Sequence, residues 1–174
     1  MSRRRKPTRT PKPTSLGELP LAPAVYALCG GSARRRYVAY VGLARRLRPR
    51  IYQHLIGRDS SVAAGTSAAG INPDYVTEVR WWQSGGFRGK HALEAAEIVA
   101  AEILQPVLRS RAMTPKAAER KLHDEEFCKR MKTLFDGEPT GSVPVPSLAG
   151  LDTRLRAVEK ELAKMLKGLG DQNG

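Results

Sequence analysis

Cysteines are scarce in this sequence, and long apolar runs are missing from it. The two cysteines, Cys29 and Cys128, lie far apart and have no histidines at metal-ligand spacing, which argues against a zinc site. No segment approaches the roughly 20 apolar residues that span a bilayer, so no transmembrane helix is predicted. The basic, proline-rich N-terminus has no apolar segment behind it, which argues against a secretory signal peptide. We therefore expect a cytoplasmic protein with reduced thiols.

Acidic residues are almost absent from the first third of the chain. Residues 1–58 contain 14 lysines and arginines and a single acid, Glu18, whereas residues 59–174 contain 16 basic and 16 acidic residues. The whole net charge of +13 therefore falls on the first third, where it creates a positive field suited to a polyanion. Nucleic acid is the expected partner. A membrane surface is not, because residues 1–15 lack the apolar face of interfacial helices.

The N-terminal third predicts a disordered arm followed by a β-hairpin. Residues 1–23 are rich in Arg, Lys, Thr and Pro and cannot bury enough surface to offset their ordering entropy, which predicts a disordered arm. This arm either solubilises the protein or binds DNA. Residues 24–29 are an apolar run, and residues 36–41 are rich in aromatic and β-branched residues, as strands are. The short link at residues 30–32 predicts a hairpin, and Gly42 is expected to end its second strand.

Helix and strand patterns follow the hairpin. Apolar residues recur at three- and four-residue steps over residues 46–56, which predicts an amphipathic helix with Pro49 in its first turn. Residues 58–74 predict a loop rich in Ser, Ala and Gly, and residues 75–82 predict a third strand. Residues 90–104 predict a helix that is apolar on most sides and therefore central to the packing.

The C-terminal part predicts helices joined by a linker. Thr114 and Pro115 supply a capping residue and a first-turn proline, which open a polar helical extension over residues 113–135. A proline-rich linker is expected over residues 136–147, and an amphipathic helix over residues 148–174. The apolar residues of that helix alternate steps of three and four: Leu148, Leu151, Leu155, Val158, Leu162, Met165 and Leu169. This heptad pattern fits either a helix docked on its own domain or a seam with a partner, which can be a second copy in a homodimer.

Glu97 is a carboxylate within the otherwise apolar helix predicted at residues 90–104. Burial of a carboxylate is costly without a cation partner, and Mg²⁺ is typically held by one or two protein carboxylates together with phosphate and water. Glu97 is therefore a candidate ligand for Mg²⁺ (or Mn²⁺). Glu94 lies one turn earlier on a similar face and is the rival candidate, whereas Glu102 points away. The alternative for either residue is a solvated glutamate on a helix edge.

Four further side chains are candidates for phosphate chemistry. Arg50 and His54 lie four residues apart on one helix face, where they can contact one phosphate, although a solvated basic face has the same pattern. Tyr26 and Tyr40 lie on the two predicted hairpin strands, where core packing is the alternative to chemistry.

The order and spacing of these residues resemble the GIY-YIG endonuclease family over residues 24–109. Residues 24–26 (Ala-Val-Tyr) occupy the place of the first family signature, and residues 40–42 (Tyr-Val-Gly) are a close version of the second. Arg50 follows Tyr40 by ten residues, as in the family, and many members have a histidine at the position of His54. Glu97 precedes Pro106 by nine residues, which is the spacing of the family's metal-binding glutamate.

The resemblance implies a fold and a reaction. The fold would be a small α/β (α+β) domain over residues 24–112, with a three-stranded antiparallel sheet flanked by helices and followed by a helical C-terminal extension. The reaction would be metal-dependent hydrolysis of DNA phosphodiester bonds. Glu97 would hold the metal, and Arg50 would stabilise charge on the phosphate. Tyr26 and Tyr40 would position or deprotonate the attacking water, with His54 assisting, if Arg50 and the metal lower the tyrosine pKa.

Two features depart from the family pattern. The Gly and Ile of the first signature are not matched, and Arg109 occupies a position where the family usually has Asn. These departures leave open a nucleic-acid-binding module that has lost cutting, and charge alone also fits an RNA-associated basic protein. The candidate nucleic-acid-binding residues are Arg34, Arg35, Arg36, Arg45, Arg46, Arg48, Arg88 and Lys90.

Overall fold

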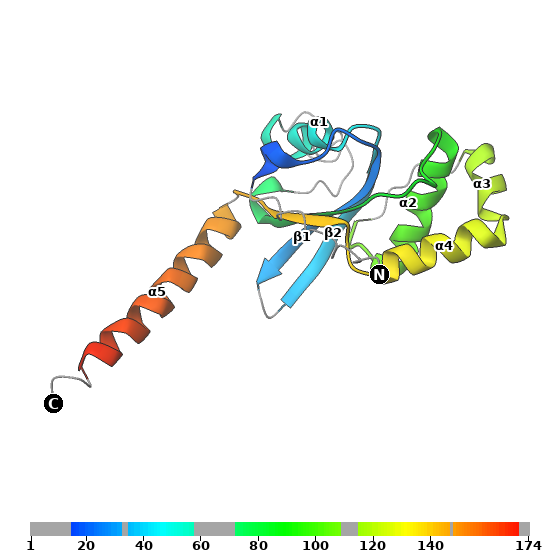
Figure 1. Cartoon of the computed structure of the whole chain (residues 1–174). Coiled ribbons are helices and arrows are strands. Elements are labelled where there is room, and N and C mark those ends of the chain that lie inside the picture. Colours follow the sequence, from blue (N-terminus) through cyan, green and yellow to red (C-terminus); the bar gives the residue numbers. More distant parts are fainter. Residues whose placement is uncertain (1–14, 33–34, 58–71, 109–114, 147, 171–174) are drawn as a thin grey trace, which may run out of the picture.

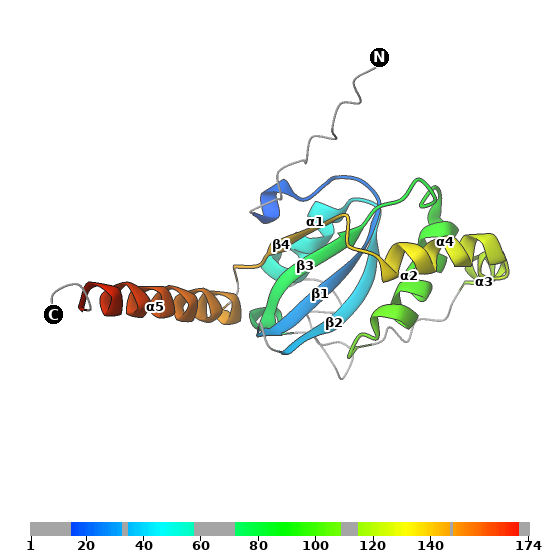
Figure 2. The same cartoon turned by 60° about the horizontal axis from the view of Figure 1, so that its bottom comes forward.

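A four-stranded antiparallel sheet organises the molecule. The computed structural model describes residues 15–32, 35–57, 72–108, 115–146 and 148–170. The sheet contains four strands in the order β2-β1-β3-β4, which lie side by side in Figure 2: β1 (Ala24–Ser32), β2 (Arg35–Ala44), β3 (Val76–Trp82) and β4 (Gly141–Pro144). The expected mixed α/β class is confirmed, but the sheet has four strands rather than three.

The hairpin of β1 and β2 is longer than predicted. Residues 30–32 belong to β1 rather than to a link, and Ser32 pairs with Arg35 at the tip. Gly30 packs beneath the ring of Tyr37, because an added Cβ would lie 2.6 Å from the Tyr37 hydroxyl oxygen. Gly42 does not end β2, which continues to Ala44. Glycine is needed at both positions for close approach of an aromatic ring and does not mark a turn.

One face of the sheet is covered by α1 (Leu47–Tyr52), which continues as a π-helical turn, η2 (Gln53–Gly57). The predicted start of this helix and the first-turn position of Pro49 are confirmed, since a proline there removes no intrahelical hydrogen bond. Leu47 and Ile51 are fully buried against the sheet. The π turn brings His54 into the core, where its side chain is 1% exposed.

The packed fold begins before the predicted strand boundary at residue 24. The short 3-10 turn η1 (Leu16–Glu18) and the residues after it contact α1, and Leu16 and Leu19 are buried in the same core as Tyr26. The Arg48 Nε donates a hydrogen bond of 2.7 Å to the Leu19 carbonyl oxygen. The predicted arm is therefore too long, because two leucines give residues 15–23 apolar surface to bury; residues 1–14 lie outside the described part of the chain.

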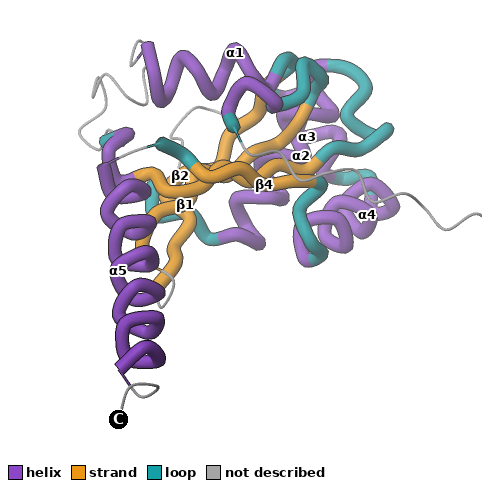
Figure 3. The backbone as a smooth tube through the Cα atoms, turned by 60° about the vertical axis from the view of Figure 1, so that its left-hand side comes forward, coloured by secondary structure: helices purple, strands orange, loops and turns teal. Residues whose placement is uncertain are grey.

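The opposite face of the sheet is covered by α2 (Lys90–Leu104) and α4 (Glu125–Asp136), and α3 (Lys116–Leu122) packs on these two helices (Figure 3). The bounds of α2 are those predicted. The single helix predicted over residues 113–135 is wrong, because α3 ends at Leu122 and a new helix begins after Asp124. The Asp124 side chain accepts a hydrogen bond of 2.9 Å from the Phe127 N–H and thereby caps α4. Residues 113–135 are predicted to be a helical extension outside the domain, but α3 and α4 pack directly on α2.

The predicted linker over residues 136–147 contains β4. Val143 and Val145 are buried, and Gly141 lies against the Trp81 ring with no room for a Cβ. Pro144 is compatible with this strand because β4 is at an edge of the sheet, where one side of the backbone needs no partner. The sequence predicts a linker here because the segment is short and contains Gly and Pro.

The last helix, α5 (Leu148–Gly170), points away from the body of the protein (Figure 1). It contacts η3 (Pro73–Tyr75) and β3, but its apolar side chains remain exposed. α5 therefore contacts its own domain near its first residues without burying its apolar side chains there. None of the described helices has the length and apolarity to cross a lipid bilayer.

Candidate active site

Five residues predicted from the sequence lie close together, although they come from five different elements. Tyr26 is on β1, Tyr40 on β2, Arg50 on α1, His54 on η2 and Glu97 on α2. Tyr26, Tyr40 and His54 contact one another through their rings and a hydrogen bond. The charges of Arg50 and Glu97 shift the pKa of both tyrosines, and the charge of Arg50 lowers the pKa of Glu97.

Three rings form the buried part of this cluster. The ring centroids of Tyr26 and Tyr40 are 6.2 Å apart, and His54 lies 5.7 Å from the first and 5.9 Å from the second. The Tyr26 hydroxyl and the His54 Nε2 form a hydrogen bond of 2.6 Å. Its direction depends on which ring nitrogen of His54 carries the proton. The three rings thus pack against one another, and the polar atoms of Tyr26 and His54 are in direct contact.

Gly42 makes room for both tyrosines. It pairs with Tyr26 across the hairpin, and a Cβ at this position would lie 2.6 Å from both the Tyr26 hydroxyl oxygen and the Tyr40 Cε1. Sequence reasoning missed this positioning role, although Gly42 closes the Tyr-Val-Gly motif. The signal that could have found it is a glycine inside a strand two residues after an aromatic residue.

Glu97 reaches the cluster past the part of β2 that contains Leu43, whereas Val38 and Ala39 in the same strand accept hydrogen bonds from the Val107 and Leu108 N–H groups. β2 is an edge strand, and α2 packs beside it on the opposite face from the tyrosines. The Glu97 carboxylate accepts a hydrogen bond from the Leu43 backbone N–H. The role of the Leu43 backbone was missed from the sequence, because no side chain marks it.

Burial dominates the protonation of the cluster. It raises the pKa of Tyr26, with a further rise from Tyr40, and raises the pKa of Tyr40 to about 12. It lowers the pKa of His54 to about 4 and raises the pKa of Glu97 to about 7, with the Glu94 charge adding to the second effect. The positive charge of Arg50 opposes the rise in pKa at Tyr26, Tyr40 and Glu97. It does not bring the pKa of either tyrosine below its ordinary value, although a tyrosine that acts as a base needs a lowered pKa.

The structure separates Glu97 from its rival Glu94. Glu94 forms an ion pair with Lys90 at 3.7 Å and contacts His91 at 3.2 Å, and both of these partners are exposed residues of α2. The charge of Glu97 raises the pKa of Tyr26 and Tyr40, whereas the charge of Glu94 raises the pKa of Glu97. Glu97 is therefore the carboxylate of the cluster.

The cluster fits a divalent cation held by one carboxylate. Within the described ranges, no group of three or more His, Cys, Asp and Glu side chains could hold a metal ion by itself. A site for Mg²⁺ does not need such a group, because water and substrate phosphate supply most of its ligands. Glu97 is a shielded carboxylate that makes no ion pair with the described residues, so a cation beside it would offset the cost of its burial.

The candidate nucleic-acid-binding residues fall into two groups at opposite ends of β2. Arg35 and Arg36 lie at the hairpin tip, whereas Arg45 and Arg46 follow the other end of the strand, roughly 30 Å away along it. Arg88 and Lys90 follow β3, which leaves the sheet at the same end as Arg45, since β1 pairs there with both strands. Arg34 lies outside the described residues.

Three of these basic side chains have partners within the protein. Arg36 forms an ion pair with Glu78 at 3.4 Å, Lys90 pairs with Glu94, and Arg48 binds the Leu19 carbonyl group. Arg35, Arg45, Arg46 and Arg88 are exposed. The end of the sheet near Arg45, Arg46 and Arg88 is therefore the more accessible positive surface close to the cluster.

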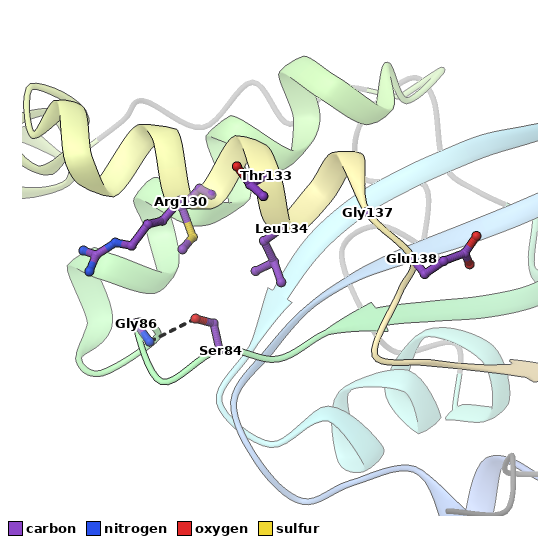
Figure 4. A pocket seen from close by; sticks show the side chains of 8 residues that line it. Ser84, Gly86, Arg130, Thr133, Leu134, Gly137 and Glu138 are labelled. Carbon is purple, nitrogen blue, oxygen red and sulfur yellow. Dashed lines mark hydrogen bonds between the residues drawn. The ribbon is translucent and has the colours of Figure 1, made fainter. Parts of the chain in front are cut away.

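A separate hollow of about 440 Å³ lies beside α4 (Figure 4). Its charged residues, Arg130 and Glu138, lie at opposite ends of the hollow, and the Ser84 hydroxyl already accepts a hydrogen bond of 3.1 Å from the Gly86 N–H. Its polar groups do not converge on one point, as those of a ligand site do.

Comparison with protein-family models, with curated proteins and with solved structures found no match for this chain.

Proposed function

We propose that the protein is a metal-dependent endonuclease that hydrolyses phosphodiester bonds of DNA, as its resemblance to the GIY-YIG family implies. The observation that carries the proposal is the proximity of Tyr26, Tyr40, Arg50, His54 and Glu97, which lie on separate elements and come from both faces of the sheet. Core packing explains buried tyrosines, but it does not explain why a glutamate, an arginine and a histidine meet there.

Arg50 and Glu97 would hold the reacting phosphate. The Arg50 guanidinium is permanently charged and presents a fork of donors that matches two phosphate oxygens. Glu97 would bind Mg²⁺ or Mn²⁺, which polarises the phosphate and stabilises charge on the leaving oxygen. The exposed Arg45, Arg46 and Arg88 would position the DNA backbone beside this site.

Tyr26 and His54 would act together on the attacking water. Water must lose a proton as it attacks phosphorus, and a tyrosine with a raised pKa is a poor base by itself. His54 is neutral at physiological pH and lies 2.6 Å from the Tyr26 hydroxyl, so in the tautomer whose Nε2 carries no proton it can take the Tyr26 proton while Tyr26 accepts one from water. The negative charge of a bound phosphate would raise the pKa of His54 and favour this transfer.

The proposal is tested with supercoiled plasmid, Mg²⁺ or Mn²⁺ and the purified protein. We expect the parent to nick the plasmid, EDTA to stop the reaction, and Glu97→Ala and Arg50→Ala to lose about a hundredfold or more in rate. Glu102→Ala is the matched control, because Glu102 is an exposed glutamate on the same helix. Cleavage that persists undiminished in Glu97→Ala would remove the assignment.

A second candidate is a nucleic-acid-binding protein that has kept this arrangement without cutting. It is favoured by the raised pKa of both tyrosines, because burial opposes their use as bases. This candidate predicts that the parent binds duplex DNA in a gel-shift assay but leaves the plasmid intact with every metal tested.

A further inference from the structure

The described part of the protein leaves the apolar face of α5 exposed. Its core-type residues lie at the two heptad positions that form coiled-coil seams, with Leu148, Leu155 and Leu162 at the first position and Leu151, Val158 and Met165 at the second. These side chains are between 46% and 69% exposed. A single helix gains most of its stability from packing such a face, so α5 requires something to cover it.

The charges beside this apolar face favour a second copy of the chain over a lipid surface. Interfacial helices carry mostly Lys and Arg on the polar face and often Trp or Phe on the other. α5 has no aromatic residue, and three acids, Asp152, Glu159 and Glu161, lie among its basic residues. Mixed charges beside a leucine seam are typical of helices that pair with another helix.

The same charges favour a parallel pair. In a parallel coiled coil, Arg154 flanks the seam on one side and faces Glu159 of the other copy, which gives two attractive pairs by symmetry. In an antiparallel pair of this length, Glu159 would face Asp152, so like charges would meet twice and offset the two attractive contacts between Arg154 and Glu161. Asp152 forms an ion pair with Arg156 at 2.9 Å within the helix, whereas Arg154 and Glu159 form none with the described residues.

We propose that α5 pairs with α5 of a second copy as a short parallel coiled coil, making the protein a homodimer. Parallel pairing places both catalytic domains at the same end of the coil, because each domain precedes α5 in the chain (Figure 1). Two sites at one end can act on both strands of one duplex. That consequence rests on the proposed nuclease function, whereas the pairing itself does not.

The pairing is tested by sedimentation equilibrium of the full chain. We expect the mass of two chains for the parent and of one chain for Leu155→Lys, since a charge in the seam excludes close packing. The matched control is Ala157→Lys, which adds the same charge two residues away on the outer face and should remain dimeric. A parent with the mass of one chain, or of three or more, would overturn the proposal.

Orientation is tested by exchanging charges at the seam. Arg154→Glu and Glu159→Arg should each raise the dimer dissociation constant roughly tenfold, and the double exchange should restore it, because each parallel pair is then reversed but again attractive. An antiparallel dimer gives a different pattern, because Glu159→Arg would then face Asp152 and tighten the dimer. Tightening by Glu159→Arg would overturn the parallel arrangement. Neither the sedimentation mass nor the dimer dissociation constant depends on DNA cleavage. A failure of the dimer proposal is therefore distinguishable from a failure of the nuclease proposal.

Discussion

The Tyr26 hydroxyl lies 2.6 Å from the His54 Nε2, and this hydrogen bond joins two side chains that are almost completely buried. It connects β1 to the π turn after α1 and fixes the orientation of both rings beside Tyr40. The bond therefore belongs both to the core and to the candidate active site.

We predict that Tyr26→Phe destabilises the protein by about 1 to 3 kcal/mol, because it removes a hydrogen bond from a buried ring without changing the packing volume much. Urea unfolding of Tyr26→Phe, His54→Leu and the double variant should show a coupling energy of about 0.5 kcal/mol or more. Tyr75→Phe is the control, because Tyr75 is 63% exposed. Additive effects of the two changes would contradict a direct energetic link.

Stability should depend on pH through two opposing groups. Because the pKa of His54 falls from 6.5 to about 4 on folding, the unfolded chain binds more protons between these values, and stability rises with pH there. Because the pKa of Glu97 rises from 4.5 to about 7, the folded chain binds more protons in that window, and stability falls as pH rises. The two effects partly cancel in the parent.

Removing one group should expose the other. In Glu97→Gln, the urea midpoint should rise more steeply than in the parent between pH 4 and 6.5, and in His54→Gln it should fall more steeply between pH 4.5 and 7. Glu102→Gln should keep the parental profile. Identical pH profiles for all four proteins would show that neither group changes its pKa on folding.

Gly42→Ala should destabilise the protein by about 1 to 3 kcal/mol and reduce plasmid nicking, because the new methyl group would displace both tyrosine rings. Gly85→Ala is the matched control, since a Cβ at Gly85 meets no atom within 4 Å, and its effect should stay within about 0.5 kcal/mol. Thermal or urea unfolding measures the first effect and the plasmid assay the second. A fully stable, fully active Gly42→Ala would show that the ring positions tolerate movement.

Deletion of residues 1–14 should flatten the salt dependence of DNA binding. This segment carries six lysines and arginines, and the slope of log affinity against log salt concentration should fall by up to about 0.9 for each phosphate that they neutralise. Fluorescence anisotropy with a short duplex at several salt concentrations measures the slope. An unchanged slope would show that these residues do not touch the DNA backbone.

Several elements can be predicted because their signals are local. The apolar run of β1, the period of α1 and the composition of α2 each lie within one segment, so the prediction for α2 matches its observed bounds. β4 cannot be predicted in this way, because four residues with a proline become a strand only when β3 offers its free edge. Leu16 and Leu19 likewise fall within the predicted arm, since their burial depends on α1.

The sequence by itself determined which chemical groups are present and how they are spaced: two tyrosines on hairpin strands, Arg50 and His54 four residues apart, and one glutamate in an apolar helix. Only the tertiary structure decided that these groups meet, because β2 is an edge strand around which Glu97 can reach the tyrosines. It also decided their protonation, since burial raises the tyrosine pKa more than the charge of Arg50 lowers it. Spacing is a property of the chain, whereas proximity and desolvation are properties of the folded protein.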